Sequence, residues 1–254
     1  MFPFLANLII ATAALSGAGN EPGASSYLHA FQPGTDGVIA TRPEVYVPQP
    51  GDLILFDDRN PTWIKLYHYV GSDMPDHSGI VIKLPDGRPA FLESAPDDGH
   101  LAGLYVRILH ALPRLHQFKG TIYVRRLKVP LTPEQSDKLT EFAFAQEGKK
   151  YAIWRMLLQG TWFRCRSGWR AKYFAETDMN RNRWLCSEIV VAAGTAAGLF
   201  DPNIHKANRI YPRDLIYDDH YDLSQTWDEA WVWGPTPERP SCDPPKLDPW
   251  PELP

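Results

Sequence analysis

Three side chains from separate parts of the chain have the chemical types of a nucleophile, a base and an orienting acid. Cys186 opens the small, apolar stretch CSEIVVAAG, His77 opens the run HSGIVI, and Glu93 lies in the apolar run PAFLES. A cysteine nucleophile needs a base within hydrogen-bonding reach and a polar group that holds that base. A helix N-terminus and a nearby imidazole both favour a thiolate. These residues therefore predict covalent catalysis through a thioester, provided that the fold brings them together.

Each of the three residues also has a structural interpretation. Cys186 fits a buried structural cysteine, because free cysteine is among the most buried residue types. His77 fits a strand-edge histidine with a satisfied hydrogen bond. Glu93 is harder to explain in this way, since an unpaired carboxylate in an apolar strand is costly to bury. A metal site is a weaker interpretation, because the three residues lack dense spacing such as Cys-x-x-Cys. We predict no metal and no cofactor.

The histidine and the glutamate lie on two successive predicted strands. The runs HSGIVI and PAFLES flank a Pro-Asp-Gly turn at 85–87. Two adjacent antiparallel strands can set His77 beside Glu93, since cross-strand neighbours have Cβ atoms roughly 5 Å apart. Further strands are predicted at LILF, GLYVRIL and GTIYVRRL. Short strands joined by turn residues indicate a small antiparallel barrel or sheet.

Two helices complete the expected fold. The stretch LTPEQSDKLTEFAFAQEG begins with Thr132 as N-cap and Pro133 at the first helical position. Gln135 completes a capping box, and Gly148 ends the helix. A second helix starts at Cys186, with apolar residues at helical spacing after it. The sequence therefore predicts an α+β protein in which the sheet packs against helices, one of which carries the cysteine.

Composition limits the domain organisation and the partners. The chain has 254 residues, 44% hydrophobic and 22% charged, which is enough for one sizeable core. Its net charge of -4 gives no reason to expect a nucleic acid partner. We predict a signal peptide at 1–18, a linker or wrapping segment at 19–50, a catalytic domain at 51–220 with an insertion at about 154–183, and a Pro-rich tail at 221–254.

The N-terminus and the cysteine count bear on the compartment. The apolar run before residue 18 ends in small residues that suit a signal-peptidase site, although no Lys or Arg precedes it. We therefore expect an exported, periplasmic or extracellular protein. If the run is instead a disordered or core-packed segment, the protein is cytoplasmic. Three cysteines allow one internal disulfide, and a pair between Cys165 and Cys242 would leave Cys186 free.

Several short motifs, in this order along the chain, resemble a known family. They are similar to the NlpC-like cysteine hydrolases of the papain-like fold, in their circularly permuted YiiX/YaeF form. In unpermuted relatives the cysteine helix precedes the strands, whereas here the histidine comes first. The permuted branch also includes the lecithin:retinol acyltransferase-like enzymes. The resemblance covers roughly 50–218 and rests on the motifs GDLI, HSGIV, LES, EGKKY, LCSEIV and YPRDLIYD.

The resemblance carries one more residue into the site and leaves one segment unexplained. Tyr151 matches a tyrosine that in the family lines the site and is placed to help the oxyanion. The insertion at 154–183 is longer than in compact members and interleaves tryptophan with arginine. Such a segment suits a lid, a patch for an anionic headgroup or glycan, or a membrane-surface element. It equally suits an insertion whose indoles pack on the barrel and whose arginines face solvent.

The resemblance implies a thiol hydrolase that cleaves an amide in a cell-wall or other peptide. Cys186, His77 and Glu93 would form the triad, with an acyl-enzyme intermediate. A lipid-ester hydrolase or acyltransferase on the same triad is the alternative from the permuted branch. A non-catalytic binding module with this fold is a further alternative, although the presence of all three residues argues against it.

Overall fold

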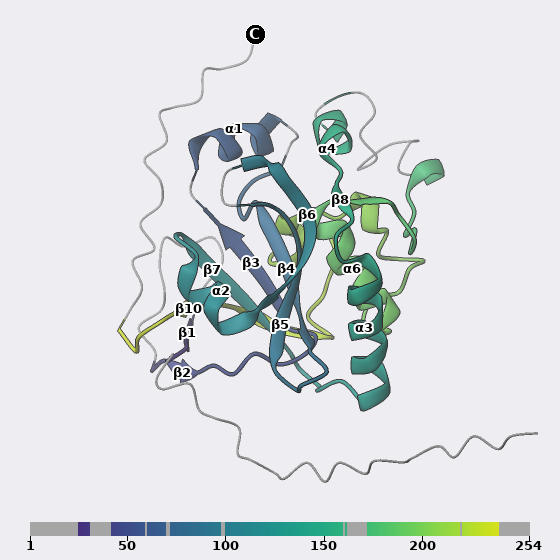
Figure 1. Ribbon diagram of the computed structural model, residues 1–254. Coiled ribbons are helices and arrows are strands. Elements are labelled where there is room, and N and C mark those ends of the chain that lie inside the picture. Colours follow the sequence, from purple (N-terminus) through teal and green to yellow (C-terminus); the bar gives the residue numbers. More distant parts are fainter. Residues whose placement is uncertain are drawn as a thin grey trace, which may run out of the picture.

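The computed structural model of the protein describes residues 25–30, 42–58, 60–69, 72–97, 100–159, 161, 172–218 and 220–238 (Figure 1). The predicted signal peptide, Cys165, Cys242 and the central part of the insertion lie outside these residues. The predictions made for them therefore stay predictions.

One sheet organises the described part of the chain, and ten of its strands are defined there (Figure 1). The order is β2-β1-β10-β7-β3-β4-β5-β6-β8-β9, and neighbours are antiparallel except β8 and β9. The end strands β2 and β9 do not pair with each other in the described residues, so the sheet is open rather than a closed barrel. The strands are β1 (Tyr27–Ala30), β2 (Glu44–Val45), β3 (Leu53–Asp57), β4 (His77–Lys83), β5 (Pro89–Asp97), β6 (His100–His110), β7 (Thr121–Leu127), β8 (Lys150–Tyr151), β9 (Arg183–Trp184) and β10 (Trp227–Gly234).

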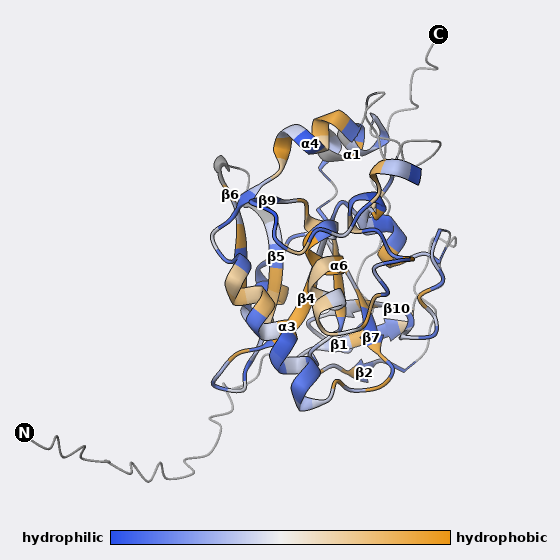
Figure 2. Ribbon diagram, turned by 90° about the vertical axis from the view of Figure 1, so that its right-hand side faces the viewer, coloured by the Kyte–Doolittle hydropathy of each residue, from blue (hydrophilic) through white to orange (hydrophobic). Residues whose placement is uncertain are grey.

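The middle of the sheet is buried on both faces, which explains the unbroken apolar run LILF in β3. Successive side chains of a strand point to opposite faces. Leu53 and Leu55 join one hydrophobic cluster with residues of α3 and α6, whereas Ile54 and Phe56 join a second cluster with residues of α2. A strand covered on both faces needs apolar residues at every position. Figure 2 shows the hydrophobic colour of β4, β5 and α6 in the interior of the molecule.

The helices in the described residues cover both faces of this sheet (Figure 1). The predicted helix after residue 132 is confirmed: Thr132 and Gln135 form the capping box, and Gly148 has a positive φ of 76° just beyond the helix. The helix that begins with Cys186 is confirmed as well. The helices are α1 (Pro61–Tyr69), α2 (Ala111–Gln117), α3 (Pro133–Gln146), α4 (Ile153–Gln159) and α6 (Cys186–Ala196), with 3-10 helices η1 (Ala207–Arg209) and η2 (Pro212–Leu215).

The α+β class is confirmed, but two segments are more ordered than the sequence predicts. Trp227–Gly234 lies in the segment 221–254 that we interpreted as a Pro-rich tail, yet it forms β10 between β1 and β7. Its residues precede the proline cluster, and its last three residues, Val232–Gly234, are all buried. Tyr27–Ala30, from the predicted linker at 19–50, pairs with β10. Within the described residues, no helix is both long enough and apolar enough to span a membrane.

Candidate active site

His77 and Glu93 meet across neighbouring strands, with a glycine between them. His77 begins β4, and Glu93 of β5 lies opposite Gly79 rather than opposite His77 itself. The two side chains are thus diagonal neighbours, a separation that long side chains can bridge. Because Gly79 has no side chain, the ring can reach the carboxylate: His77 Nε2 lies 3.1 Å from Glu93 Oε2. The ring also stacks on Phe56, with centroids 5.3 Å apart and planes inclined by 24°.

Cys186 comes to the same place from the start of α6. Its Sγ lies 4.0 Å from the carbonyl oxygen of Asp76, the residue before His77, so the beginnings of α6 and β4 lie together. The thiol is buried, and Cys186 is a free cysteine. As the first residue of its helix, it has a backbone N–H with no intrahelical acceptor. The structure thus brings the three predicted residues to one point from β4, β5 and α6.

The charges of this cluster stabilise an imidazolium beside a carboxylate. Burial acts to lower the pKa of His77, but hydrogen bonds with Cys186 and Glu93 outweigh it and raise the pKa to about 9. Burial acts to raise the pKa of the fully buried Glu93, but its hydrogen bond and charge interaction with His77 lower it to about 2. The charges of Arg114 and Arg107 act in the same direction. Between these two values both groups carry their charges.

Two buried tyrosines interact with the thiol, and only one of them, Tyr151, was predicted from the sequence. Tyr151, predicted to line the site, lies in β8; its hydroxyl donates to Met156 Sδ at 3.4 Å and also interacts with Cys186. Tyr67 of α1 is the second. Burial first, and then the charge of Cys186, raise the pKa of both phenols well above 10. Pro61 and the spacing from Ile64 to Tyr67 could have indicated α1, but no local pattern connects it to Cys186.

Asp76 is a second residue that the sequence reasoning missed. Its side chain is buried, and its Oδ1 has no hydrogen-bond partner. Burial and the nearby Asp58 raise the pKa of Asp76 to about 8, although the charge of His77 acts to lower it. The neutral form of Asp76 is therefore favoured more than that of an ordinary aspartate. No feature of the sequence around it distinguishes it from an ordinary residue before a strand.

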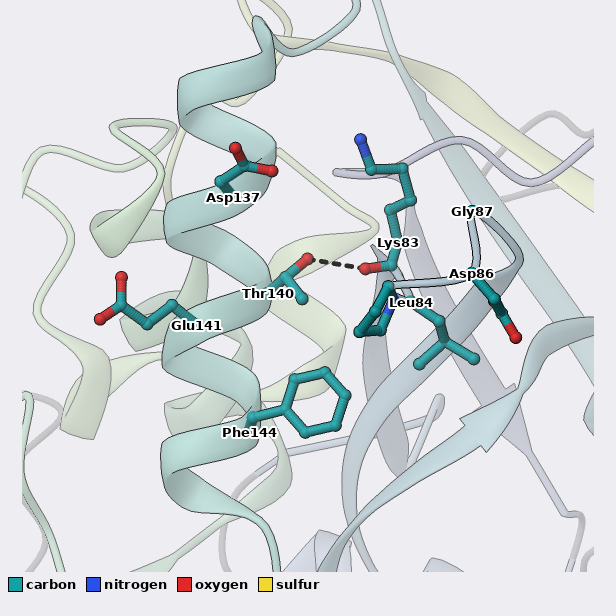
Figure 3. A pocket seen from close by; sticks show the side chains of 9 residues that line it. Lys83, Leu84, Asp86, Gly87, Asp137, Thr140, Glu141 and Phe144 are labelled. Carbon is teal, nitrogen blue, oxygen red and sulfur yellow. Dashed lines mark hydrogen bonds between the residues drawn. The ribbon is translucent and has the colours of Figure 1, made fainter. Parts of the chain in front are cut away.

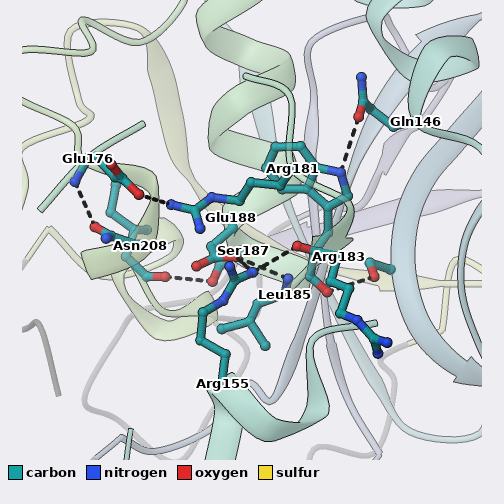
Figure 4. Close-up of polar contacts among 12 residues, drawn as sticks. Gln146, Arg155, Glu176, Arg181, Arg183, Leu185, Ser187, Glu188 and Asn208 are labelled. Carbon is teal, nitrogen blue, oxygen red and sulfur yellow. Dashed lines mark hydrogen bonds and ion pairs between the residues drawn. The ribbon is translucent and has the colours of Figure 1, made fainter. Parts of the chain in front are cut away.

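Glu188 supports the start of the cysteine helix rather than the chemistry (Figure 4). Its Oε2 accepts a hydrogen bond from the backbone N–H of Leu185 at 3.2 Å and forms an ion pair with Arg155 at 2.5 Å. Arg155, on α4, also donates to the carbonyl of Arg183 at 2.8 Å. Glu188 lies in the first turn of α6, where the helix dipole favours a negative charge. The start of the insertion is thereby joined to the loop before Cys186.

Elsewhere in the described residues we find weaker candidates for a functional site. No group of three or more histidine, cysteine, aspartate or glutamate side chains among them is arranged to hold a metal ion. A hollow lies between the 84–88 turn and α3, where Thr140 Oγ1 donates to the carbonyl of Lys83 at 2.9 Å (Figure 3). Its lining contains acidic side chains and Phe144, and none of the predicted catalytic residues.

Comparisons with known proteins add one structural neighbour. No family model matches the chain, and no curated protein matches it. Among solved structures, the metalloprotein YiiX from Escherichia coli O157:H7 is similar, with 22% sequence identity and a TM-score of 0.40. The match covers 60% of this chain and 67% of that one.

Proposed function

We propose that the protein is a thiol hydrolase of the permuted NlpC-like type, with a Cys186–His77–Glu93 triad. The observation that carries this proposal is the meeting of the three groups at the start of α6 and β4, with the His77–Glu93 contact at 3.1 Å. Glu93 holds one ring nitrogen, which leaves Nδ1 for the sulfur. Burial of such an ion pair costs desolvation free energy unless further hydrogen bonds compensate it. Buried charged groups of this kind are therefore typical of functional sites.

The geometry supports a two-step reaction. The Cys186 sulfur attacks an acyl carbon, and the tetrahedral oxyanion is stabilised by the Cys186 backbone N–H at the helix N-terminus, with Tyr151 beside it. Protonated His77 gives its proton to the leaving group, so that a thioester remains on the enzyme. His77 then takes a proton from water, which attacks the thioester and frees Cys186. Glu93 keeps the ring in place throughout and stays ionised.

For the substrate we propose an amide of a cell-wall peptide or another peptide, in an exported protein. The motif resemblance to the NlpC-like enzymes supports this choice, because those enzymes cleave peptide amides. The proposal needs no metal and no cofactor.

A lipid ester is the second candidate substrate, and the outer face of α4 favours it. Trp154 is 74% exposed, and Leu157 and Leu158 of the same helix are also exposed. Figures 1 and 2 both show α4 at the end of the molecule that also carries α1, the helix that supplies Tyr67 to the site. An apolar face beside the site suits an amphipathic substrate or a membrane surface.

Alkylation of the thiol tests the triad without knowledge of the substrate. The full chain is treated with iodoacetamide, and the rate at each cysteine is read by mass spectrometry. We expect Cys186 to react faster in the wild type than in His77→Ala, with His110→Ala, an exposed histidine, as the matched control. Equal and slow alkylation of Cys186 in all three proteins would favour a buried structural cysteine or a binding module.

Product analysis then separates the two substrates. Purified muropeptides and phospholipid vesicles are each incubated with the wild type and with Cys186→Ala. New amino groups from muropeptides support the amidase, and released fatty acid or transferred acyl chains support the lipid enzyme. In either case the product must be missing with Cys186→Ala.

A further inference from the structure

We propose that Arg114 is a positioning residue that fixes the ring of His77 by holding both Glu93 and Phe56. This inference rests on the proposed function, because it assigns Arg114 a part in the same triad. Arg114 lies on α2, a helix that the sequence did not indicate, and no part of the mechanism above uses it.

The first contact of Arg114 is with the carboxylate. Its Nε lies 3.2 Å from Glu93 Oε1 and 3.4 Å from Oε2, the oxygen that His77 also contacts. Glu93 is fully buried, and its acceptor positions exceed what one imidazole N–H can fill. A single guanidinium N–H lies close to both oxygens, and rotation of the carboxylate away from it would weaken this ionic contact. Glu93 therefore presents Oε2 to the ring in one orientation.

The second contact is with the aromatic ring behind the histidine. The Arg114 guanidinium carbon lies 5.0 Å from the centre of the Phe56 ring and 5.6 Å from that of Phe118. Phe56 is the ring on which His77 stacks. Contacts therefore run in a closed circuit from Arg114 to Glu93, to His77, to Phe56 and back to Arg114. The side chain of Arg114 is only 13% exposed, so water screens these contacts little.

Arg107 does not share this arrangement. Its Nη2 lies 3.5 Å from Glu93 Oε1, the oxygen farther from the histidine contact, and its side chain is more exposed than that of Arg114. Arg107 adds positive charge near Glu93, whereas Arg114 touches both carboxylate oxygens and Phe56.

The test measures the pKa of His77 in the full chain by NMR of labelled histidine rings. Removal of a nearby cation by itself raises the pKa of a histidine, because the imidazolium loses a repelling charge. Loss of positioning lowers it, because the Glu93 hydrogen bond that holds it up becomes disordered. We expect Arg114→Gln to lower the pKa of His77 from about 9 toward its ordinary value of 6.5. We also expect it to slow the alkylation of Cys186 by about tenfold, the size of a lost ionic hydrogen bond.

Further variants make the result decisive. Arg114→Lys keeps the charge but lacks the Nε–H near both oxygens and the flat guanidinium over Phe56, so the pKa of His77 should also fall, by less. Arg126→Gln is the matched control, because Arg126 likewise pairs with a glutamate, Glu44, at 2.8 Å and lies over Trp231 at 5.2 Å. It should change neither the pKa of His77 nor the alkylation rate.

Other outcomes would contradict either the role of Arg114 or the proposed function. An unchanged or raised pKa of His77 in both Arg114 variants overturns the positioning role. If His77→Ala does not slow alkylation, the proposed function fails, whatever Arg114 does. If His77→Ala slows alkylation and Arg114→Gln leaves both readouts unchanged, only the inference about Arg114 fails.

Discussion

Replacement of Glu93 by glutamine should destabilise the fold by about 3 kcal/mol at neutral pH. The side chain keeps its shape and size but loses its charge, which leaves His77 and two arginines without their buried counter-ion. The magnitude follows from the pKa of Glu93, which folding lowers from 4.5 to about 2. Each unit of that difference corresponds to about 1.4 kcal/mol in favour of the ionised form. Breaking a buried ion pair typically costs about 3–5 kcal/mol, which agrees.

The sign of the pH dependence provides the sharper test. A carboxylate whose pKa is lowered by folding adds stability above its unfolded pKa, and this stability is lost as the pH falls through the folded value. The difference between wild type and Glu93→Gln should therefore shrink from about 3 kcal/mol at pH 7 to about 1 kcal/mol at pH 3. Urea unfolding followed by tryptophan fluorescence measures it. A difference that is equally large at both pH values would refute the assignment of a buried, ionised Glu93.

A matched control guards against a general effect of lost charge. Glu134 of α3 forms an exposed ion pair with Lys138 at 2.7 Å. Exposed pairs contribute little to stability, so Glu134→Gln should unfold at nearly the same urea concentration as the wild type at both pH values.

Three further predictions follow from named contacts. In Gly194→Ala, the new Cβ would lie 2.5 Å from Phe200 Cδ2, so we expect a loss of about 1–3 kcal/mol in urea unfolding, and an unchanged midpoint would contradict this packing. Arg125→Met should cost about 1–3 kcal/mol, because the buried guanidinium donates to the carbonyls of Asp228 and Leu215, which lose their donor, and pairs with Asp218 at 2.9 Å. Its effect on Cys186 alkylation should be small, and a large effect would link this pair to the site. Tyr67→Phe should slow the alkylation of Cys186 by about fivefold, because the hydrogen bond between the Tyr67 hydroxyl and the sulfur is lost, and the melting temperature should stay unchanged. Equal alkylation rates in the wild type and Tyr67→Phe would show that Tyr67 has no part in the site.

The parts of the fold that were predictable are those with local signals. The strands between 51 and 127 carry apolar runs between turn residues, and α3 carries its cap, its proline and its terminal glycine in a continuous stretch. Short helices such as α2 lack these signals: its N-cap, His110, makes no side-chain capping bond. β10 was missed because its eight residues, WDEAWVWG, include two acidic side chains, lie near a proline cluster and gain their order from pairing with β1 and β7.

The residues of the candidate site likewise divide into those with a local sequence signal and those without one. His77, Glu93 and Cys186 stand at the starts of elements or in a conspicuous position, and motif resemblance placed Tyr151 with them. Tyr67, Asp76, Arg107 and Arg114 reach the site only through the tertiary fold, on residues that are unremarkable in their own segments. The diagonal contact between His77 and Glu93 across Gly79 could not be predicted from the sequence either, because the register of two strands depends on the whole sheet.

The ladder between β1 and β10 has a consequence for biosynthesis. Tyr27 pairs with Gly234, so β1 must wait for a strand that is translated about two hundred residues later. Until then the outer edge of β7 stays open to other strands, a situation that invites misassociation. A nascent chain that stops before residue 227 would already contain Cys186, His77 and Glu93, yet its sheet would lack the strand that joins β1 and β2 to the rest.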